Sequence, residues 1–221
     1  MPIVVGIDGT GPMSNDRYAA DFANSFVRRI CTRGNAANKR YSRGPITPGG
    51  GLPQSINRSY SFITARRVGA RRNESILLTG FSRGGLGVLV VADMLRRDGI
   101  PVTAMLLFDA VDRHLGYSAQ RVPDNVLNVF HARRSRAAGS RESFGNCGTQ
   151  WNRQTTNYVE QFFRCTHGAV GGTPQSNPAK PNDFVSEIPD GRTNVTFTDN
   201  VRISAQVWAA VQPFINQYDF I

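Results

Sequence analysis

A strand-like apolar run that passes directly into Gly-x-Ser-x-Gly, and then into a helical pattern, is the strongest constraint in this sequence. The run covers residues 76–79 and the turn covers residues 80–84. A turn this tight needs glycine on both sides of its central residue, because a side chain at Gly80 or Gly84 would collide with neighbouring segments. The pattern therefore predicts a strand, a sharp turn that exposes the Ser82 hydroxyl, and a helix.

Short apolar runs alternate with amphipathic stretches along most of the chain. Runs that are almost continuously apolar are typical of a parallel sheet buried on both faces, and the stretches between them have helical spacing. We therefore expect a compact α/β fold with a mostly parallel central sheet of about five to six strands and helices on both faces. The expected strands are 3–7, 75–79, 102–108, 126–130 and 159–164, and the expected helices are 14–33, 55–71, 84–97 and 201–214.

The remaining segments predict loops and one further strand. Residues 34–53 are rich in Gly, Pro, Asn and Arg and should form a long loop that borders a site. Residues 173–182 should form a Pro-rich loop, and residues 194–198 a short edge strand. The chain has 221 residues, of which 40% are hydrophobic, and shows no internal repeat or linker. We therefore expect a single domain over residues 1–221.

Ser82 is a candidate nucleophile, and a serine hydroxyl needs a neighbouring base to take its proton. The sequence has three histidines, His114, His131 and His167. In a sheet with this turn, the expected chain order is nucleophile, acid and then a base on a late loop. His167 fits that order because it follows the last apolar run in a Gly-rich segment. His131 falls at a strand and His114 beside an arginine, so we expect packing or solvent roles for both.

An acid must orient the base and offset its charge in the transition state, and Asp109 is the first candidate. Asp109 directly follows the apolar run 105–108. It is therefore expected at the carboxyl end of a strand, where parallel sheets carry their functional groups. Asp112 is the main rival, with Asp124 and Asp199 behind it.

A tetrahedral intermediate also needs backbone N–H donors for its oxyanion. The residue after the nucleophile, Arg83, would supply the first donor. The turn at residues 8–11, directly after the first strand, would supply the second, from Gly9 or Thr10. The same turn could equally be an ordinary tight turn, and one turn can serve both purposes.

Four segments follow one another in chain order: Ile-Asp-Gly-Thr at 7–10, Gly-Phe-Ser-Arg-Gly-Gly at 80–85, Leu-Phe-Asp-Ala-Val-Asp at 107–112 and Thr-His-Gly-Ala-Val-Gly-Gly at 166–172. In this order they resemble the bacterial α/β-hydrolases related to type VI secretion lipase effectors. The resemblance implies an α/β-hydrolase fold, a triad of Ser82, Asp109 and His167, and hydrolysis of carboxylic esters, with lipid or phospholipid as one substrate class. The effectors are longer and carry lid insertions, for which this chain has room only at 34–53 and 133–160.

The charge of the chain is strongly positive, with 26 Lys and Arg against 16 Asp and Glu and a formal net charge of +10. Most of these cations are arginines, which bind phosphates and carboxylates through two N–H groups at once. The leading hypothesis is a serine ester hydrolase that acts on acyl esters, with an anionic lipid surface as a candidate partner. A small soluble ester is the other option, and an arginine-rich solvated surface needs no partner at all. The oligomeric state stays open.

A second hypothesis is a non-catalytic module that binds an anionic polymer through its arginines. Few aromatic residues accompany these arginines, so base stacking is poorly supported and no stable nucleic acid partner is expected. A fluorophosphonate probe would discriminate, because a pure binding module has no reactive serine. The arginines concerned are Arg66, Arg67, Arg71, Arg72, Arg133, Arg134, Arg136 and Arg141.

The three cysteines form no pair or cluster with the spacing of a metal site, and no cofactor or metal is expected. Cys31 falls on the apolar side of a helix and should be a core thiol, whereas Cys147 and Cys165 flank a loop, and a disulfide between them stays open. The first residues lack the basic and apolar regions of a signal peptide, and no run reaches the ~18 apolar residues of a membrane span. We expect a cytoplasmic protein or one exported by a signal-less route.

Overall fold

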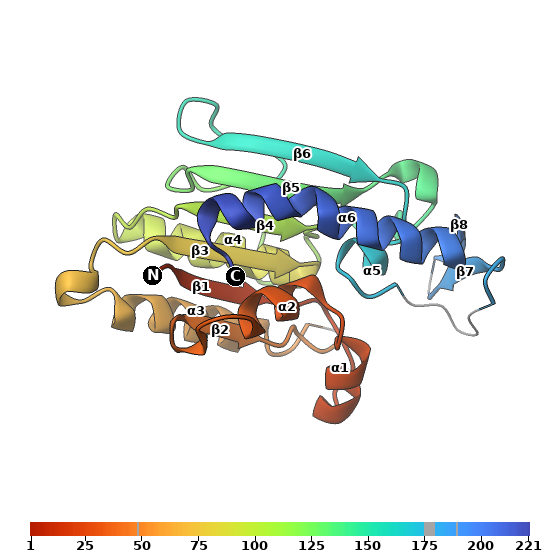
Figure 1. The fold of residues 1–221 in the computed structure, drawn as a ribbon, viewed down its shortest axis with the longest axis horizontal. Coiled ribbons are helices and arrows are strands. Elements are labelled where there is room, and N and C mark those ends of the chain that lie inside the picture. The colour runs from red at the N-terminus through yellow and green to blue at the C-terminus, as the bar shows by residue number, and fades with distance from the viewer. Residues whose placement is uncertain (48, 175–179, 189) are drawn as a thin grey trace.

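A six-stranded sheet runs through the middle of the molecule in the computed structural model (Figure 1), which describes residues 1–47, 49–174, 180–188 and 190–221. Neighbouring strands are parallel throughout, in the order β2-β1-β3-β4-β5-β6, which confirms the expected α/β class. The central strands are almost wholly buried, as their apolar runs predict. The strands are β1 (Ile3–Ile7), β2 (Lys39–Ser42), β3 (Ile76–Phe81), β4 (Ala104–Phe108), β5 (Asn128–Arg134) and β6 (Asn157–Phe163).

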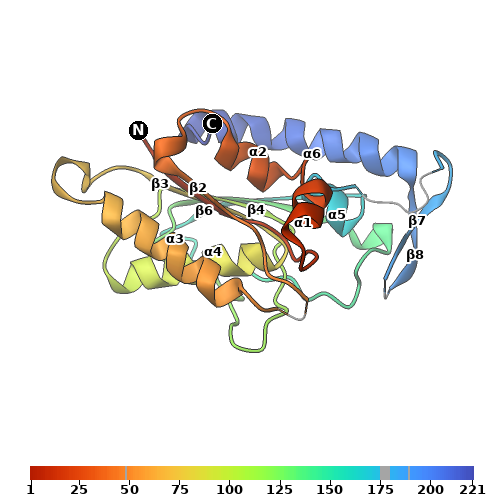
Figure 2. The same cartoon turned by 90° about the horizontal axis from the view of Figure 1, so that it is seen from below.

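Helices cover both faces of this sheet, with α3 and α4 on one side and α2 and α6 on the other (Figure 2). Alternate residues of β1 serve the two faces: Ile3 and Val5 pack toward α3 and α4, and Val4 packs toward α2 and α6. The core is therefore two apolar layers separated by the sheet. The helices are α1 (Asn15–Asp21), α2 (Phe26–Thr32), α3 (Leu52–Arg66), α4 (Arg83–Arg97), α5 (His167–Val170) and α6 (Phe197–Tyr218).

The first expected helix, at 14–33, is two helices in the structure. α1 ends at Asp21, because the next residue, Phe22, has φ of −105° and ψ of 16° and leaves helical geometry, and α2 begins after Ser25. The Ser25 hydroxyl accepts the Arg28 N–H at 3.4 Å and caps α2. The apolar spacing continues across the break because Phe22 and Phe26 both pack into the same cluster. The apolar periodicity therefore predicted one helix where a capping serine starts a second one.

The expected loop at 34–53 contains an edge strand. Lys39–Ser42 form β2, which pairs in parallel with β1. All four residues are half-buried, so the strand lacks the apolar run that marks the central strands. Pro48 of this loop lies outside the described residues.

The C-terminal part of the chain adds an antiparallel pair, β7 (Phe184–Glu187) and β8 (Gly191–Thr196), which is separate from the main sheet. The expected edge strand at 194–198 overlaps β8 but belongs to this pair. Thr196 then caps α6, with its hydroxyl accepting the Asp199 N–H at 3.2 Å, so α6 begins earlier than expected. Residues 175–179 of the expected Pro-rich loop lie outside the described residues.

The register of the parallel strands determines which residues meet at the carboxyl edge of the sheet. Phe81 of β3 pairs with Phe108 of β4, and Phe108 pairs with Ala132 of β5. The residues that follow, Ser82 and Asp109, therefore emerge side by side. Within the described residues, no helix combines the length and the apolar content needed to cross a bilayer.

Candidate active site

Ser82 lies at the sharp turn between β3 and α4, with φ of 57° and ψ of −129°. This left-handed φ is rare for a residue with a side chain and costs on the order of 1 to 3 kcal/mol. Neighbouring strands hold it, because the Ser82 N–H donates to Phe108 O at 3.1 Å. A Cβ on Gly80 would lie 2.6 Å from Gly84 O, and a Cβ on Gly84 would collide with the Ile7 carbonyl. Both glycines of the motif are thus sterically required.

The structure brings Ser82, His167 and Asp109 into one chain of hydrogen bonds. Ser82 Oγ lies 2.8 Å from His167 Nε2, and His167 Nδ1 lies 2.7 Å from Asp109 Oδ2. All three side chains are buried or nearly so. His167 opens α5, which Thr166 caps by accepting the Ala169 N–H at 3.3 Å.

Asp109 has φ of 44° directly after β4, so its carboxylate turns toward the neighbouring strand β5. It accepts three side-chain hydrogen bonds, from His167, from Arg134 Nη1 at 2.5 Å and from Asn146 Nδ2 at 2.9 Å. Burial alone would raise the pKa of this carboxyl, but the hydrogen bond and charge of His167, together with the Arg134 guanidinium, hold it well below its usual range. Asp109 is therefore ionised at neutral pH.

The rival acids lie elsewhere. Asp112 accepts hydrogen bonds from Ser118 Oγ at 2.7 Å and from Gln120 Nε2 at 3.2 Å in its own loop. Asp124 forms an exposed ion pair with Arg121. Asp199 forms an exposed ion pair with Arg202 in the first turn of α6. None of the three reaches His167 by a hydrogen bond in the part of the chain that the structure describes.

The other two histidines have different partners. His131 is fully buried in β5, where Nε2 accepts the Ala110 N–H at 3.2 Å and Nδ1 lies 3.1 Å from Tyr158 Oη. Burial lowers the pKa of His131 to about 3. His114 accepts the Gly116 N–H at 3.0 Å within its own loop. Both positions agree with the packing and solvent roles expected from the sequence.

Three residues of the site have no counterpart among the expected site residues: Arg134, Ser140 and Asn146. Arg134 is buried, and besides Asp109 it binds the carbonyl oxygens of Ser140, Arg141 and Phe144. Ser140 Oγ accepts the His167 N–H at 2.8 Å. A usable signal existed for Arg134, because it is the last residue of β5, the strand next to β4, and Asp109 directly follows β4.

The first strand ends in a turn that faces Ser82. Asp8 is fully buried, and its Oδ1 accepts the Gly9 N–H at 2.9 Å while its Oδ2 accepts the Tyr41 hydroxyl at 2.9 Å. Burial raises the pKa of Asp8 to about 6. For the Thr10 N–H, no acceptor is found within the described ranges of the chain. Gly9 already donates to Asp8, so of the two expected donors in this turn it is the Thr10 N–H that lacks an acceptor among the described residues.

Arg83 is the first residue of α4, so its backbone N–H has no acceptor within the helix. Its side chain reaches across to the β1 turn, where Nη1 donates to Thr10 Oγ1 at 3.3 Å. The two expected donor residues, Arg83 and Thr10, are therefore in contact beside Ser82.

A pocket of about 850 Å³ opens over Ser82 and His167. Thr47 is its one described contribution from the expected loop at 34–53. The α1 helix and the β7 strand also line it, which the sequence did not suggest. Its aromatic lining consists of Phe22, Phe81, Phe144 and Phe197.

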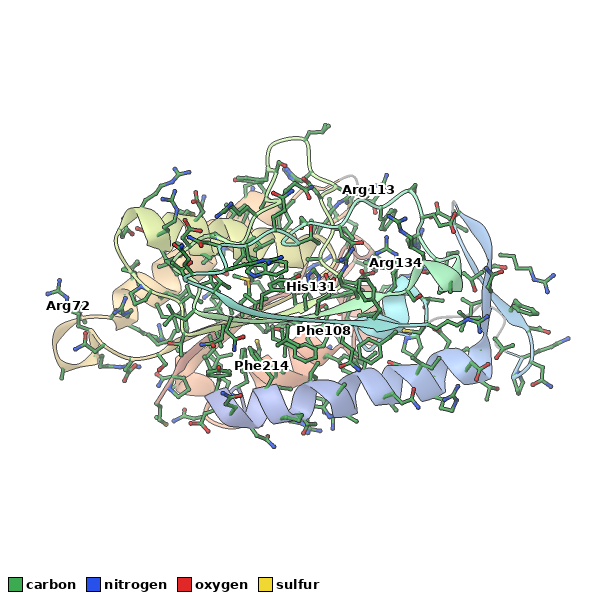
Figure 3. All side chains as sticks on the ribbon, turned by 90° about the horizontal axis from the view of Figure 1, so that it is seen from above. Arg72, Phe108, Arg113, His131, Arg134 and Phe214 are labelled. Atoms are coloured by element: carbon green, nitrogen blue, oxygen red, sulfur yellow. The ribbon has the colours of Figure 1, made fainter. Side chains whose placement is uncertain are left out.

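The arginines of the polymer-binding hypothesis are mostly engaged within the protein. Arg71 pairs with Glu74 at 2.7 Å, Arg133 with Glu160 at 2.6 Å, and Arg134 is buried against Asp109. In Figure 3, Arg72 lies at one end of the molecule, whereas Arg134 lies toward the other end. The two arginine-rich segments therefore do not form one continuous patch.

The cysteines are all buried free thiols. Cys147 packs in the apolar layer beneath α3 and α4, and Cys165 packs in the layer beneath α2 and α6. A disulfide between Cys147 and Cys165 is absent because the sheet separates them. Among the described residues, no group of three His, Cys, Asp or Glu side chains could hold a metal ion.

The parallel sheet, with helices on both faces and a strand, turn and helix around Ser82, defines a compact α/β fold. An uncharacterized protein from Pseudomonas aeruginosa shares this fold with a TM-score of 0.51 at 13% identity, over 95% of this chain and 45% of that chain. The NocB thioesterase domain is similar with a TM-score of 0.44 at 11% identity, over 78% of this chain and 91% of that chain. No protein-family model and no curated protein matches the sequence.

Proposed function

We propose that this protein is a serine hydrolase of carboxylic esters, with Ser82 as nucleophile, His167 as general base and Asp109 as the acid that orients it. The observation that carries the proposal is the continuous chain of hydrogen bonds, 2.8 Å from Ser82 Oγ to His167 Nε2 and 2.7 Å from His167 Nδ1 to Asp109 Oδ2. These distances are within reach for proton transfer. The strained backbone of Ser82 further supports the proposal, because such strain concentrates at functional sites.

In the first half of the reaction, Ser82 Oγ gives its proton to His167 Nε2 and bonds to the ester carbonyl carbon. The carbonyl electron pair moves to oxygen, and the oxyanion accepts hydrogen bonds from the N–H groups of Arg83 and Thr10. When the intermediate collapses, the bond to the alcohol oxygen breaks, and His167 returns the proton to that oxygen. The products are a free alcohol and an acyl-enzyme on Ser82.

In the second half, a water molecule replaces the alcohol. His167 takes one proton from the water as its oxygen bonds to the acyl carbon, and the same two N–H groups stabilise the new oxyanion. Collapse breaks the bond to Ser82 Oγ, which recovers its proton from His167, and the carboxylic acid leaves. Asp109 stays ionised throughout and offsets the transient charge on His167, which its lowered pKa supports.

The substrate class that we propose includes lipid esters. The pocket of about 850 Å³ lies within the ~300 to 1,000 Å³ typical of small-molecule sites, and its aromatic lining suits an acyl chain. Ile188, which lines the same pocket, is 89% exposed and gives the rim an apolar side chain. The net charge of +10 would attract anionic lipid headgroups to the surface.

A fluorophosphonate probe with intact-mass detection tests the nucleophile. Wild-type protein should gain one adduct at Ser82 and should hydrolyse p-nitrophenyl esters, and Ser82→Ala should do neither. Ser61→Ala is the matched control, because Ser61 is exposed on α3 and does not line the pocket. Turnover by Ser82→Ala at the wild-type rate, or equal labelling of both variants, would refute the mechanism.

A further inference from the structure

The pocket over Ser82 contains four arginine side chains and two carboxylates. Arg17 lies 3.9 Å from Asp21, and Arg141 lies 3.7 Å from Glu187, so each carboxylate already has a cation beside it. The other two arginines, Arg83 and Arg113, make no ion pair with any described residue. The pocket therefore has an excess of positive charge at two defined guanidinium groups.

Arg83 and Arg113 both line the pocket over Ser82. Burial and the charge of Arg113 lower the pKa of Arg83. Two neighbouring cations without a counterion destabilise each other, and an anion that enters between them removes that cost. Arg83 is half-buried against Thr10, whereas Arg113 is exposed, so the two guanidinium groups line the same pocket with different access to solvent.

The cations also lie next to the reacting groups. Arg83 directly follows Ser82 in the chain. The Arg113 guanidinium carbon lies 4.3 Å from the centre of the Phe144 ring, and that ring makes an edge contact with His167 at 5.4 Å between ring centres. A single aromatic ring therefore separates Arg113 from the base, a separation that a short substrate spans. Arg113 lies toward the same end of the molecule as Arg134 in Figure 3.

We propose that Arg83 and Arg113 form an anion subsite of the pocket, so that the preferred substrates are acyl esters that carry a carboxylate or phosphate group near the scissile bond. This inference rests on the proposed function of Ser82. A guanidinium presents several N–H donors in a plane and binds either anion through two oxygens. The subsite would orient the ester carbonyl toward the oxyanion donors, which makes the charge a specificity determinant.

Two pairs of substrates separate the two sources of negative charge. For a carboxylate on the acyl side, the p-nitrophenyl monoester of glutaric acid is compared with p-nitrophenyl pentanoate, which has the same acyl length and no charge. For a phosphate on the alcohol side, dibutyryl glycerol phosphate is compared with dibutyryl glycerol. The ratio of kcat/KM within each pair, corrected for uncatalysed hydrolysis, measures the preference for the anion at fixed acyl length.

We expect at least one ratio to exceed one at low salt and to fall about tenfold in Arg113→Gln, since one charge-assisted hydrogen bond contributes about one order of magnitude. Arg113→Lys should recover part of the ratio, because it restores the charge without the planar fork. Arg58→Gln is the matched control: it removes the same charge from the exposed face of α3, away from the pocket, and should keep the wild-type ratio.

The subsite is wrong if both ratios are near one in the wild-type protein, or if Arg58→Gln lowers them as much as Arg113→Gln does. In either case, fluorophosphonate labelling of Ser82 and hydrolysis of the neutral esters would continue, and the proposed function would stand. Absence of labelling and of turnover on all four substrates would instead refute the proposed function itself. The larger of the two ratios identifies whether carboxylate or phosphate is the preferred anion.

Discussion

Two buried histidines, His167 and His131, contact Asp109 and the next residue, Ala110, respectively, and differ in what surrounds their ring nitrogens. His167 has a carboxylate at Nδ1 and a serine hydroxyl at Nε2, next to a pocket. His131 has the Tyr158 hydroxyl at Nδ1, and its Nε2 accepts a backbone N–H. An imidazolium is stabilised in the first setting and loses a hydrogen bond in the second. Burial alone therefore does not determine whether a histidine can act as a base, whereas its partners do.

The largest expected difference in activity is between variants that lack the His167 ring and variants that lack the His131 ring. His167→Ala should reduce kcat/KM for a p-nitrophenyl ester by ~10⁴-fold or more, because the Ser82 proton then has no acceptor. His131→Gln keeps an acceptor for the Ala110 N–H and should stay within about tenfold of the wild-type rate, as expected for a group that touches no reacting atom. Circular dichroism checks that both variants are folded. A greater loss in the folded His131 variant would reverse the two roles.

The second largest loss of activity is expected at Asp109, because a carboxylate beside Nδ1 is what His167 has and His131 lacks. Asp109→Asn should lower kcat by ~10³- to 10⁴-fold, since an amide can neither hold the required tautomer nor offset the charge of His167. Asp112→Asn, with its partners in its own loop, should change kcat by less than about tenfold. Steady-state kinetics of the two purified variants and the wild-type protein would measure these changes in kcat. The assignment of the acid fails if Asp112→Asn shows the larger loss.

The buried guanidinium beside Asp109 should contribute mainly to stability. Arg134→Met leaves the Asp109 carboxylate buried with fewer partners and should lower the free energy of unfolding by ~3 kcal/mol. Arg121→Met removes an exposed ion pair with Asp124 and should cost less than ~1 kcal/mol. Urea denaturation at pH 7 compares the two variants. Equal losses would mean that the Asp109–Arg134 pair behaves like a surface pair.

The smallest effect concerns pH and the His131 ring. The pKa of His131 is about 3 in the folded protein and ~6.5 in an unfolded chain, so between these values the unfolded state binds more protons. Stability should therefore fall as the pH drops below ~6.5, by up to ~1.4 kcal/mol per pH unit from this group. The raised pKa of Asp8 contributes with the opposite sign but equally in wild type and variant. Denaturant melts between pH 7 and 5 should show a flatter profile for His131→Gln, and parallel profiles would contradict the assignment.

The sequence predicted the central strands because burial on both faces leaves a continuous apolar run. β2 escaped prediction because Lys39–Ser42 lie at the sheet edge and are only half-buried, so hydrogen bonds to β1 hold them without an apolar pattern. The break between α1 and α2 was also not predicted, because it leaves no mark in the apolar pattern. Ser25 caps the start of a new helix even though the apolar spacing continues across the break.

The residues that meet in the candidate site were predictable where chemistry and chain order act together. The roles proposed for Ser82, Asp109 and His167 suit only certain residue types, and the parallel sheet restricts the positions from which these residues can meet. Arg134 was interpreted as one of several surface cations, because a count of charges does not reveal which of them the strand register buries. Knowledge that β5 lies beside β4 would have placed Arg134 next to Asp109.

The hydrogen bonds from Arg134 to the loop that carries Ser140 and Phe144 have a consequence for protein engineering. The same guanidinium holds Asp109, and Ser140 holds the backbone of His167. A library that reshapes the pocket through this loop would therefore alter the basicity of the base and the fit of the substrate together, and selections for new specificity would recover slow enzymes. The α1 helix lines the same pocket without a hydrogen bond to either residue among the described contacts. Diversity introduced at α1 would vary substrate fit alone.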